Sequence, residues 1–166
     1  MEQVFSPVVS MSSAPYPKVT GPNDPASAAM LKEDYAGAHG ELTGILQYTF
    51  QHVSGDSDES FANALLRIAI VEMKHLELLG KAITALGGVP TLDDGRYYWD
   101  ASKVSYAKDM RAMLAADIQA EKTAIANYQA HAARTGSDTL KALLLRIVQD
   151  EQLHLRFFEE TLAGLE

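Results

Sequence analysis

Two short motifs of the same kind contain the residues best suited to chemistry. Glu72 and His75 form one Glu-x-x-His motif, and Glu151 and His154 form the other. A spacing of three residues places a glutamate and a histidine one turn apart on the same face of a helix. A carboxylate and an imidazole on one face can bind the same metal ion, so the two motifs together can bind two ions.

The sequence before each motif is also repeated. The run Leu-Leu-Arg-Ile stands at the same distance before each Glu-x-x-His, and a further glutamate, Glu41 or Glu121, lies about one helix length upstream. The chain therefore has a helix with Glu followed by a helix with Glu-x-x-His, twice over. Some four-helix bundles bind two metal ions in their core with one Glu from each of two helices and a Glu-x-x-His motif from each of the other two.

Four helices are expected to position these residues, because apolar side chains recur at three- and four-residue steps in four long segments. Their predicted ranges are 25–53, 57–86, 105–134 and 138–163. Asp56 and Glu59 form a candidate capping box before the second helix. Gly37 and Gly40 weaken the first helix by about 1 kcal/mol each relative to alanine. Each of the four glutamates falls about halfway along its helix, so all four are expected at one level.

The connector at 87–104 is long enough to cross the bundle from end to end. It reaches roughly 60 Å when extended, whereas a helix of the predicted length spans roughly 45 Å. The other two loops are too short for this. We therefore predict an all-α four-helix bundle at 26–166, made of two antiparallel hairpins joined by a long crossover. Tyr97, Tyr98 and Trp99 are expected to clamp the crossover onto the bundle.

Residues 1–25 contain five of the six prolines and are predicted to form an extended arm. Apolar residues near the start of the arm, Val4, Phe5, Val8 and Val9, favour packing of the arm against another protein surface. Two interpretations stay open: a tail that lies on the bundle, or an arm that reaches a partner subunit.

Composition excludes several classes of function. The chain has no cysteine, so disulfides and iron–sulfur clusters are excluded, and its net charge of −8 disfavours nucleic acid. No apolar run approaches the roughly 20 residues that span a bilayer, and no signal peptide is recognisable. We expect a cytoplasmic protein without a membrane partner.

The alternative to a metal site is that each Glu-x-x-His lies on a solvated helix face. That alternative requires four acids on the apolar faces of four helices by chance, and buried acids are costly unless they are paired or bind metal. Four carboxylates and two imidazoles form a hard, oxygen-rich set that suits iron or manganese better than zinc or copper.

Over residues 26–163 the chain resembles the ferritin-like superfamily of di-metal carboxylate proteins, nearest its rubrerythrin-like branch. The segments Gly40-Glu41-Leu42, Gln47-Tyr48 and 72–79 also resemble manganese catalases. The resemblance implies two iron or manganese ions bound by Glu41, Glu72, His75, Glu121, Glu151 and His154. Rubrerythrins differ at two points: they have a glutamate where this chain has Ala124, and they carry a rubredoxin domain with Cys ligands, which this chain lacks.

The residues around the ligands can be placed from helix geometry. Asp117 lies four residues before Glu121, at the expected height of His154 on an antiparallel helix. We therefore predict that Asp117 accepts the free N–H of His154. His75 is expected to have no such partner, because the corresponding residue of the first helix is Gly37.

Tyr48 and Tyr128 each follow a candidate ligand by two turns. Each is expected either to bond a ligand carboxylate or act as a radical sink, or to fill the core. His39, His52 and His131 are out of register with the ligands and are expected at the surface or an interface.

The function expected from the resemblance is that of an oxidoreductase acting on a small oxidant, peroxide or dioxygen, with an external electron donor where one is needed. We expect a homodimer. The alternative is a ferroxidase-type protein that binds or stores iron. Storage would require a hollow shell of many subunits. A structural bundle with a vestigial site is the third possibility.

Overall fold

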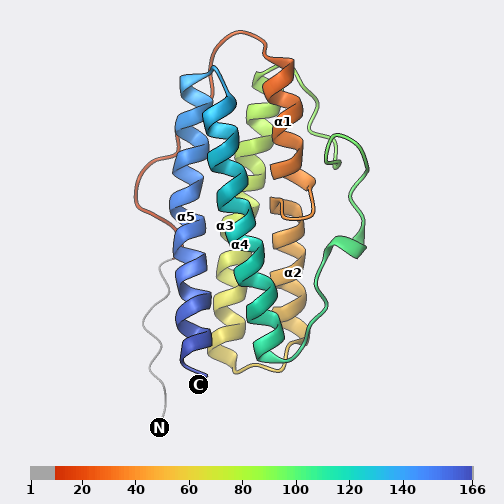
Figure 1. Ribbon diagram of the computed structural model, residues 1–166, viewed down its shortest axis with the longest axis vertical. Helices are drawn as coiled ribbons and strands as arrows, with labels where there is room; N and C mark the ends of the chain where they lie inside the picture. Colours follow the sequence, from red (N-terminus) through yellow and green to blue (C-terminus); the bar gives the residue numbers. More distant parts are fainter. Residues whose placement is uncertain (1–9, 166) are drawn as a thin grey trace.

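The computed structural model describes residues 10–165, and they form an all-helical bundle (Figure 1). The helices are α1 (Pro25–Ala36), α2 (Glu41–Ser54), α3 (Glu59–Ala85), α4 (Met110–Arg134) and α5 (Asp138–Ala163), with a short 3-10 helix η1 (Ala101–Lys103). α2 packs mainly against α3, and α4 against α5. α1 lies end to end with α2, so the two together occupy one of four positions (Figure 1). The predicted four-helix bundle is confirmed.

The prediction of one continuous first helix is wrong, because the chain breaks between α1 and α2. A Cβ atom on Gly40 would lie 2.6 Å from the carbonyl oxygen of Asp34, so only glycine fits where the backbone turns. The hydroxyl of Thr43 donates to the carbonyl of Gly37 across the break, at 2.7 Å. Glu41 therefore begins α2 instead of lying in the middle of a long helix.

Two other helix starts differ from the prediction. Asp58 is the N-cap of α3, and its side chain accepts from the amide of Phe61 at 2.8 Å. Asp56, the predicted cap, instead donates its own amide to the carbonyl of Lys108 at 2.8 Å. α4 starts at Met110, so the crossover is longer than predicted.

The connector between α3 and α4 runs along the side of the bundle from one end to the other, which confirms the crossover (Figure 1). Trp99 holds it in place, since its indole N–H donates to the hydroxyl of Thr43 at 2.9 Å. The expected clamp is wrong for the two tyrosines, because Tyr97 and Tyr98 are 72% and 78% exposed. Asp94 accepts the amide of Tyr97 in a tight turn that leaves this part of the connector at the surface.

Residues 10–24 form an extended segment that follows α5 before the chain turns over the end of the bundle into α1 (Figure 1). The side chain of Val19 is buried, and Thr20 exchanges hydrogen bonds with Thr139 at the start of α5. This part of the arm lies on the bundle. The apolar residues near its start lie outside the described residues; they are Val4, Phe5, Val8 and Val9.

The apolar core is divided into two clusters with a polar layer between them. One cluster lies towards α1 and contains Leu31, Leu79, Tyr128, Leu144 and Ile147 among others. The other lies towards the opposite end and contains Tyr48, Phe61, Ile68, Leu114 and Phe158 among others. The predicted metal ligands fall between the two clusters, on α2, α3, α4 and α5. This division places the acids in the middle of the bundle, where their side chains are buried.

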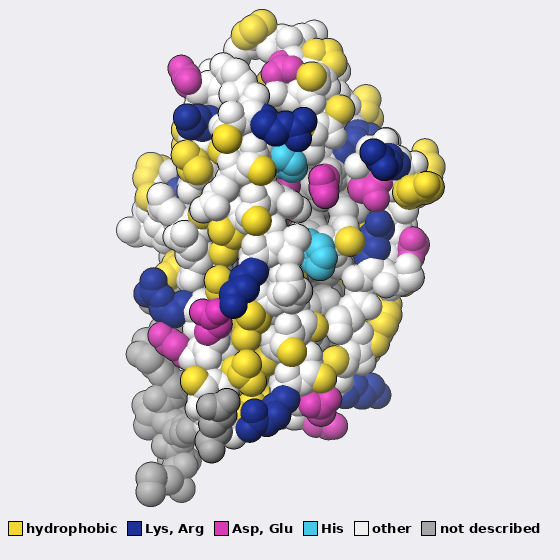
Figure 2. Space-filling view, viewed as in Figure 1, with side chains coloured by type: hydrophobic (Ala, Val, Ile, Leu, Met, Phe, Trp, Pro, Cys, Tyr) yellow, Lys and Arg dark blue, Asp and Glu magenta, His cyan; other side chains and the backbone are white. Residues whose placement is uncertain are grey.

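The surface is mixed in character. On the face drawn in Figure 2, Lys and Arg side chains alternate with Asp and Glu among hydrophobic residues. Among the described helices, none combines the length and the apolar content that a membrane crossing requires.

Candidate metal centre

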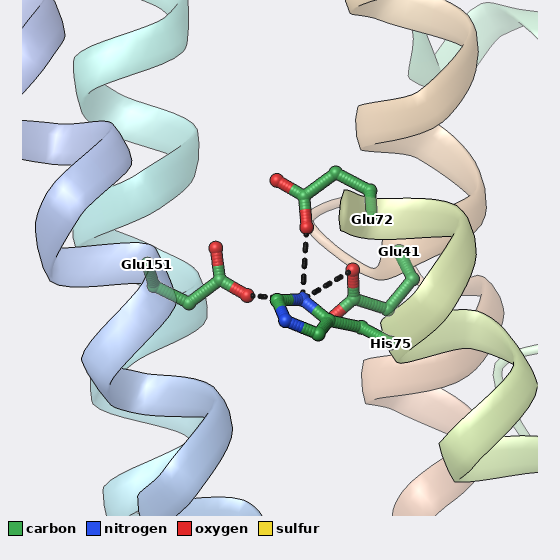
Figure 3. A group of neighbouring side chains, drawn as sticks. All are labelled: Glu41, Glu72, His75 and Glu151. Carbon is green, nitrogen blue, oxygen red and sulfur yellow. Dashed lines mark hydrogen bonds and ion pairs between the residues drawn. The ribbon is translucent and has the colours of Figure 1, made fainter. Parts of the chain in front are cut away.

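The structure brings all six predicted metal ligands together in one buried layer. They form two groups, in each of which one ligand atom per residue lies within 4.8 Å of all the others. The first group is Glu41, Glu72, His75 and Glu151, drawn in Figure 3, and the second is Glu72, Glu121, Glu151 and His154. Glu72 and Glu151 belong to both groups, as carboxylates that bridge two ions would.

His75 turns its Nδ1 atom towards three carboxylates that come from three helices (Figure 3). This nitrogen lies 3.0 Å from Glu72 Oε2, 3.0 Å from Glu151 Oε1 and 3.5 Å from Glu41 Oε2. A cation at this convergence would be bound by one nitrogen and three oxygens.

His154 has the corresponding environment in the second group. Its Nδ1 atom lies 3.1 Å from Glu72 Oε1, 3.2 Å from Glu151 Oε2 and 3.9 Å from Glu121 Oε1. Glu72 and Glu151 thus each present one oxygen to each histidine. The second group can hold another ion beside the first.

The outer two carboxylates resist ionisation without metal. Burial, followed by the negative charge of Glu72, raises the pKa of Glu41 well above its usual range. Burial, followed by the charge of Glu151, does the same to the pKa of Glu121. Burial therefore favours the protonated form of both carboxyl groups in the metal-free protein.

For the two shared carboxylates, Glu72 and Glu151, and for the two histidines, the pKa shifts favour the charged form. Although burial opposes it, the charge of His154 lowers the pKa of Glu72, and the charge of His75 likewise lowers that of Glu151. Burial also opposes the charging of both histidines, but the carboxylates around them raise the pKa values of His75 and His154 well above the usual range. In the metal-free layer these shifts favour the charged forms of the two shared carboxylates and of the two histidines.

The donor set fits two divalent cations. The Oε2 atom of Glu121 is buried and has no hydrogen-bond partner among the described residues. In each group one imidazole nitrogen faces three carboxyl groups, and an ion placed among them could bind all four residues. Four carboxylates and two neutral imidazoles would then balance two divalent charges. Such oxygen-rich coordination suits iron and manganese.

Tyr48 and Tyr128 make the hydrogen bonds that were one of their two predicted roles, but each does so across the bundle. The hydroxyl of Tyr48 on α2 donates to Glu121 on α4. The hydroxyl of Tyr128 on α4 donates to Glu41 on α2. Each tyrosine therefore fixes the outer carboxylate of the opposite hairpin.

The predicted bond between Asp117 and His154 is wrong. Asp117 is buried, but its Oδ1 atom accepts from the side-chain amides of Gln47 and Gln51, both at 2.8 Å. Burial, against the effect of these two bonds, raises the pKa of Asp117 to about 7. Its carboxylate turns towards α2 because both glutamines lie on the α2 face opposite it, and His154 bonds elsewhere.

Both histidines have partners, and neither partner is the one predicted. His75, expected to have none, directs Nε2 to Asp150 Oδ2 at 3.0 Å. His154 directs Nε2 to the carbonyl oxygen of Ser10 at 2.7 Å. The sequence contained a signal for Asp150, which directly precedes a ligand and lies four residues after Arg146. Nothing local pointed to Ser10.

His131, expected at the surface or at an interface, instead lies inside the bundle. Its side chain is buried, and its Nδ1 atom lies 2.7 Å from Asp34 Oδ2, because α1 also contacts α4. Burial outweighs this contact and raises the pKa of Asp34 to about 6. His39 is exposed and His52 is partly buried, with Nδ1 at 2.7 Å from the carbonyl of Ala62.

A pocket of about 380 Å³ reaches the polar layer from the side of the bundle. Glu41, Glu72, Glu121 and Glu151 form its inner end, and residues 102–105 of the crossover contribute to its wall. Ala124 also lines it, so this small side chain leaves space where rubrerythrins have a glutamate. A small molecule can approach the candidate ligands by this route.

Comparison with known proteins defines the class of this protein. Residues 36–166 match the model of the ferritin-like domain family, and the chain belongs to this family of di-metal carboxylate bundles. A bacterioferritin of Desulfovibrio desulfuricans is 34% identical over 125 residues, which cover 72% of this chain; the chain spans 66% of that protein's length.

Solved structures similar to this one include a manganese catalase and a bacterioferritin. The manganese catalase KatB of Anabaena PCC7120 has a TM-score of 0.85 and 28% identity, covering 93% of this chain and 79% of that chain. The D. desulfuricans bacterioferritin, described with a diiron site, has a TM-score of 0.72 and 27% identity, covering 84% of this chain and 79% of that chain. The prediction that the chain is most similar to the rubrerythrin-like branch of the family stays a prediction.

Proposed function

We propose that this protein is a dinuclear iron or manganese oxidoreductase that converts hydrogen peroxide to water and dioxygen. One observation carries the proposal: two four-residue ligand groups share Glu72 and Glu151 at the inner end of a pocket that leads in from the side. The similarity to a manganese catalase over most of this chain supports it.

Disproportionation is self-contained, since two molecules of hydrogen peroxide give two of water and one of dioxygen. One peroxide takes up two electrons and two protons, and the other gives up the same number. When bound, two ions that each change oxidation state by one unit supply the two-electron change that each half-reaction needs. No external electron donor is required, which suits a chain without cysteine.

The residues of this chain have separate tasks in the proposed site. Glu72 and Glu151 would bridge the ions, and His75 and His154 would each bind one of them. Glu41 and Glu121 would complete the two coordination sets, held by the hydroxyls of Tyr128 and Tyr48. Fixed ligands keep the site in one geometry while the charge on the ions changes.

The test is reconstitution of the metal-free protein with Mn²⁺ and, separately, with Fe²⁺. We expect about two ions per chain and release of one dioxygen for every two peroxides with one of the two metals. Binding of a single ion, or peroxide added without any dioxygen released under both conditions, would overturn the proposal. Peroxide consumption that requires an added reductant and releases no dioxygen would instead indicate a rubrerythrin-type peroxidase.

The second candidate is a ferroxidase, which the similarity to a bacterioferritin described with a diiron site favours. A ferroxidase consumes dioxygen as it oxidises Fe²⁺, and a storage protein forms a many-subunit shell. Oxygen uptake with Fe²⁺, together with light scattering, separates the two candidates. We expect a homodimer and no mineral-filled shell.

A further inference from the structure

The two halves of the candidate metal centre differ in the group that accepts a hydrogen bond from Nε2 of each histidine. Each histidine points Nδ1 at the carboxylates, so its Nε2–H needs an acceptor on the other side. Asp150, directly before Glu151, provides that acceptor for His75 at 3.0 Å. The equivalent residue before Glu72 is Val71, whose side chain cannot accept a hydrogen bond. The bundle repeat therefore supplies no carboxylate for His154.

The N-terminal arm supplies the missing acceptor. The carbonyl oxygen of Ser10 lies 2.7 Å from Nε2 of His154, 144 residues away in the sequence. The same segment also reaches the other histidine, because the hydroxyl of Tyr16 donates to Asp150 Oδ2 and lies 3.4 Å from Nε2 of His75. Residues 10–16 thus contact the outer side of both candidate metal-binding histidines.

Buried contacts fix the position of this segment. The guanidinium of Arg146 donates to the carbonyls of Ala14 and Ser12, at 2.7 and 2.8 Å, and lies 4.1 Å from the ring centre of Tyr16. The repeat shows that this burial is specific to one half: Arg67, at the equivalent place before the first motif, is exposed. Arg146 is buried because the arm covers it.

The acceptors of the two histidines differ in charge. Asp150 is a carboxylate paired with Arg146 at 2.9 Å, whereas the Ser10 carbonyl is neutral. A carboxylate that accepts the N–H of an imidazole increases the electron density on the opposite nitrogen, so that nitrogen binds a cation more strongly. A neutral carbonyl increases that electron density less, and its main effect is to orient the imidazole ring.

We propose that residues 10–16 are a positioning element of the metal centre, in which the Ser10 carbonyl orients His154, and that the contrast with Asp150 makes the ion at His75 the more tightly bound of the two. This inference rests on the dinuclear site of the proposed function. The arm then contributes to the occupancy of one ion position and not only to the cover of the bundle.

Two shortened chains test the role of Ser10. One begins at Met11, which serves as the start methionine, and lacks the Ser10 carbonyl; its matched control carries methionine in place of Val9 and keeps Ser10. In calorimetric titration of the metal-free proteins with Mn²⁺, we expect the chain from Met11 to bind the second ion about ten- to a hundred-fold more weakly than the control. The affinity for the first ion should be unchanged, which also reports that the fold is intact.

Asp150→Asn tests the other position, because the amide keeps the shape of the side chain and removes its charge. We expect a weaker first ion, and electron paramagnetic resonance at one equivalent of Mn²⁺ should then show the ion spread over both positions. Tyr16→Phe should act in the same direction, with Tyr98→Phe at the exposed connector as its control.

The outcomes separate this inference from the function itself. If the full chain binds two ions, but loss of Ser10 weakens both equally or neither, the role of the arm is overturned while the dinuclear site stands. If Asp150→Asn leaves the first ion unchanged, the inequality of the positions is overturned, even where the chain from Met11 does not fold. Fewer than two ions on the full chain would overturn both proposals.

Discussion

Single residues in the polar layer differ in whether they serve one ion position or two. Glu72 and Glu151 face both histidines, whereas Glu41 and Glu121 each face only one within 4 Å. Removal of a shared carboxylate should therefore have a larger effect on metal content than removal of an outer one.

We expect Glu72→Ala to lose both ions and Glu41→Ala to retain about one. The reason is that Glu72 contributes an oxygen to each group, and Glu41 contributes only to the group of His75. Metal content after reconstitution and dialysis measures this. His52→Ala is the control and should bind two ions, because His52 bonds the carbonyl of Ala62 outside both groups. Equal losses in the two glutamate variants would contradict bridging by Glu72.

Tyr128→Phe should destabilise the metal-free protein by about 1–3 kcal/mol, since it leaves an oxygen of Glu41 buried without its donor. Tyr48→Phe should destabilise the metal-free protein for the same reason, because it removes the hydroxyl that donates to Glu121. Chemical denaturation of the metal-free proteins measures the change. Tyr98→Phe, at an exposed hydroxyl, should have an effect near zero. If all three variants have the same stability, the two buried hydroxyls contribute nothing beyond filling space.

At the scale of elements, the break between α1 and α2 decides where Glu41 lies. The chain turns at residues 37–40 because glycine lets the backbone approach the end of α1, and α2 then starts with Glu41 as its first residue. The second half of the repeat has no such break, and Glu121 lies within α4. The two outer carboxylates therefore reach the same layer from different local structures.

Gly40→Ala should destabilise the protein by about 1–3 kcal/mol and weaken the ion at His75, because its Cβ would lie 2.6 and 2.7 Å from the backbone oxygens of Asp34 and Glu33. The start of α2 must move to relieve this overlap, and Glu41 moves with it. Thermal unfolding and metal content measure the two effects. Gly136→Ala is the matched control, since its Cβ would meet nothing within 4 Å. A normal metal content in Gly40→Ala would show that Glu41 tolerates the shift.

For the whole molecule, the stability of the bundle depends on what neutralises the layer between its two apolar clusters. Without metal, burial raises the pKa values of Glu41 and Glu121; although burial opposes it, the surrounding carboxylates raise the pKa values of both histidines. All four groups have raised pKa values in the folded protein, relative to about 4.3 for Glu and 6.5 for His when unfolded. Each of these groups contributes fully to folding stability at a pH below its pKa in the unfolded chain. That contribution is lost as the pH rises through its pKa in the folded protein.

The metal-free protein should therefore become less stable as the pH rises above about 5, whereas bound metal replaces the protons and is itself expelled by acid. We expect the rise in melting temperature on adding Mn²⁺ or Fe²⁺ to be larger at pH 8 than at pH 5. An ion at one hundred times its dissociation constant adds about 2.7 kcal/mol for one site. Calorimetry at both pH values measures this. An equal rise at both would contradict a shared buried site.

The sequence by itself determined the four-helix architecture, the crossover and the six residues of the candidate site, but not the break between α1 and α2. Helical periodicity and a three-residue spacing are local properties, and they place Glu72 beside His75 and Glu151 beside His154 whatever the rest of the chain does. The repeat of that pattern then indicated a common layer, and the length of the connector left one way to join the hairpins.

The tertiary structure alone decided what surrounds that layer. Asp150 rather than Asp117 faces a histidine, the carbonyl of Ser10 reaches His154, and His131 is buried against Asp34. Each of these contacts joins residues far apart in the sequence. Their existence depends on how helices rotate about their axes and where an extended arm lies, and both follow from the packing of the whole chain. The place of Asp150 directly before a ligand could indicate a partner for a histidine, but it could not say for which one.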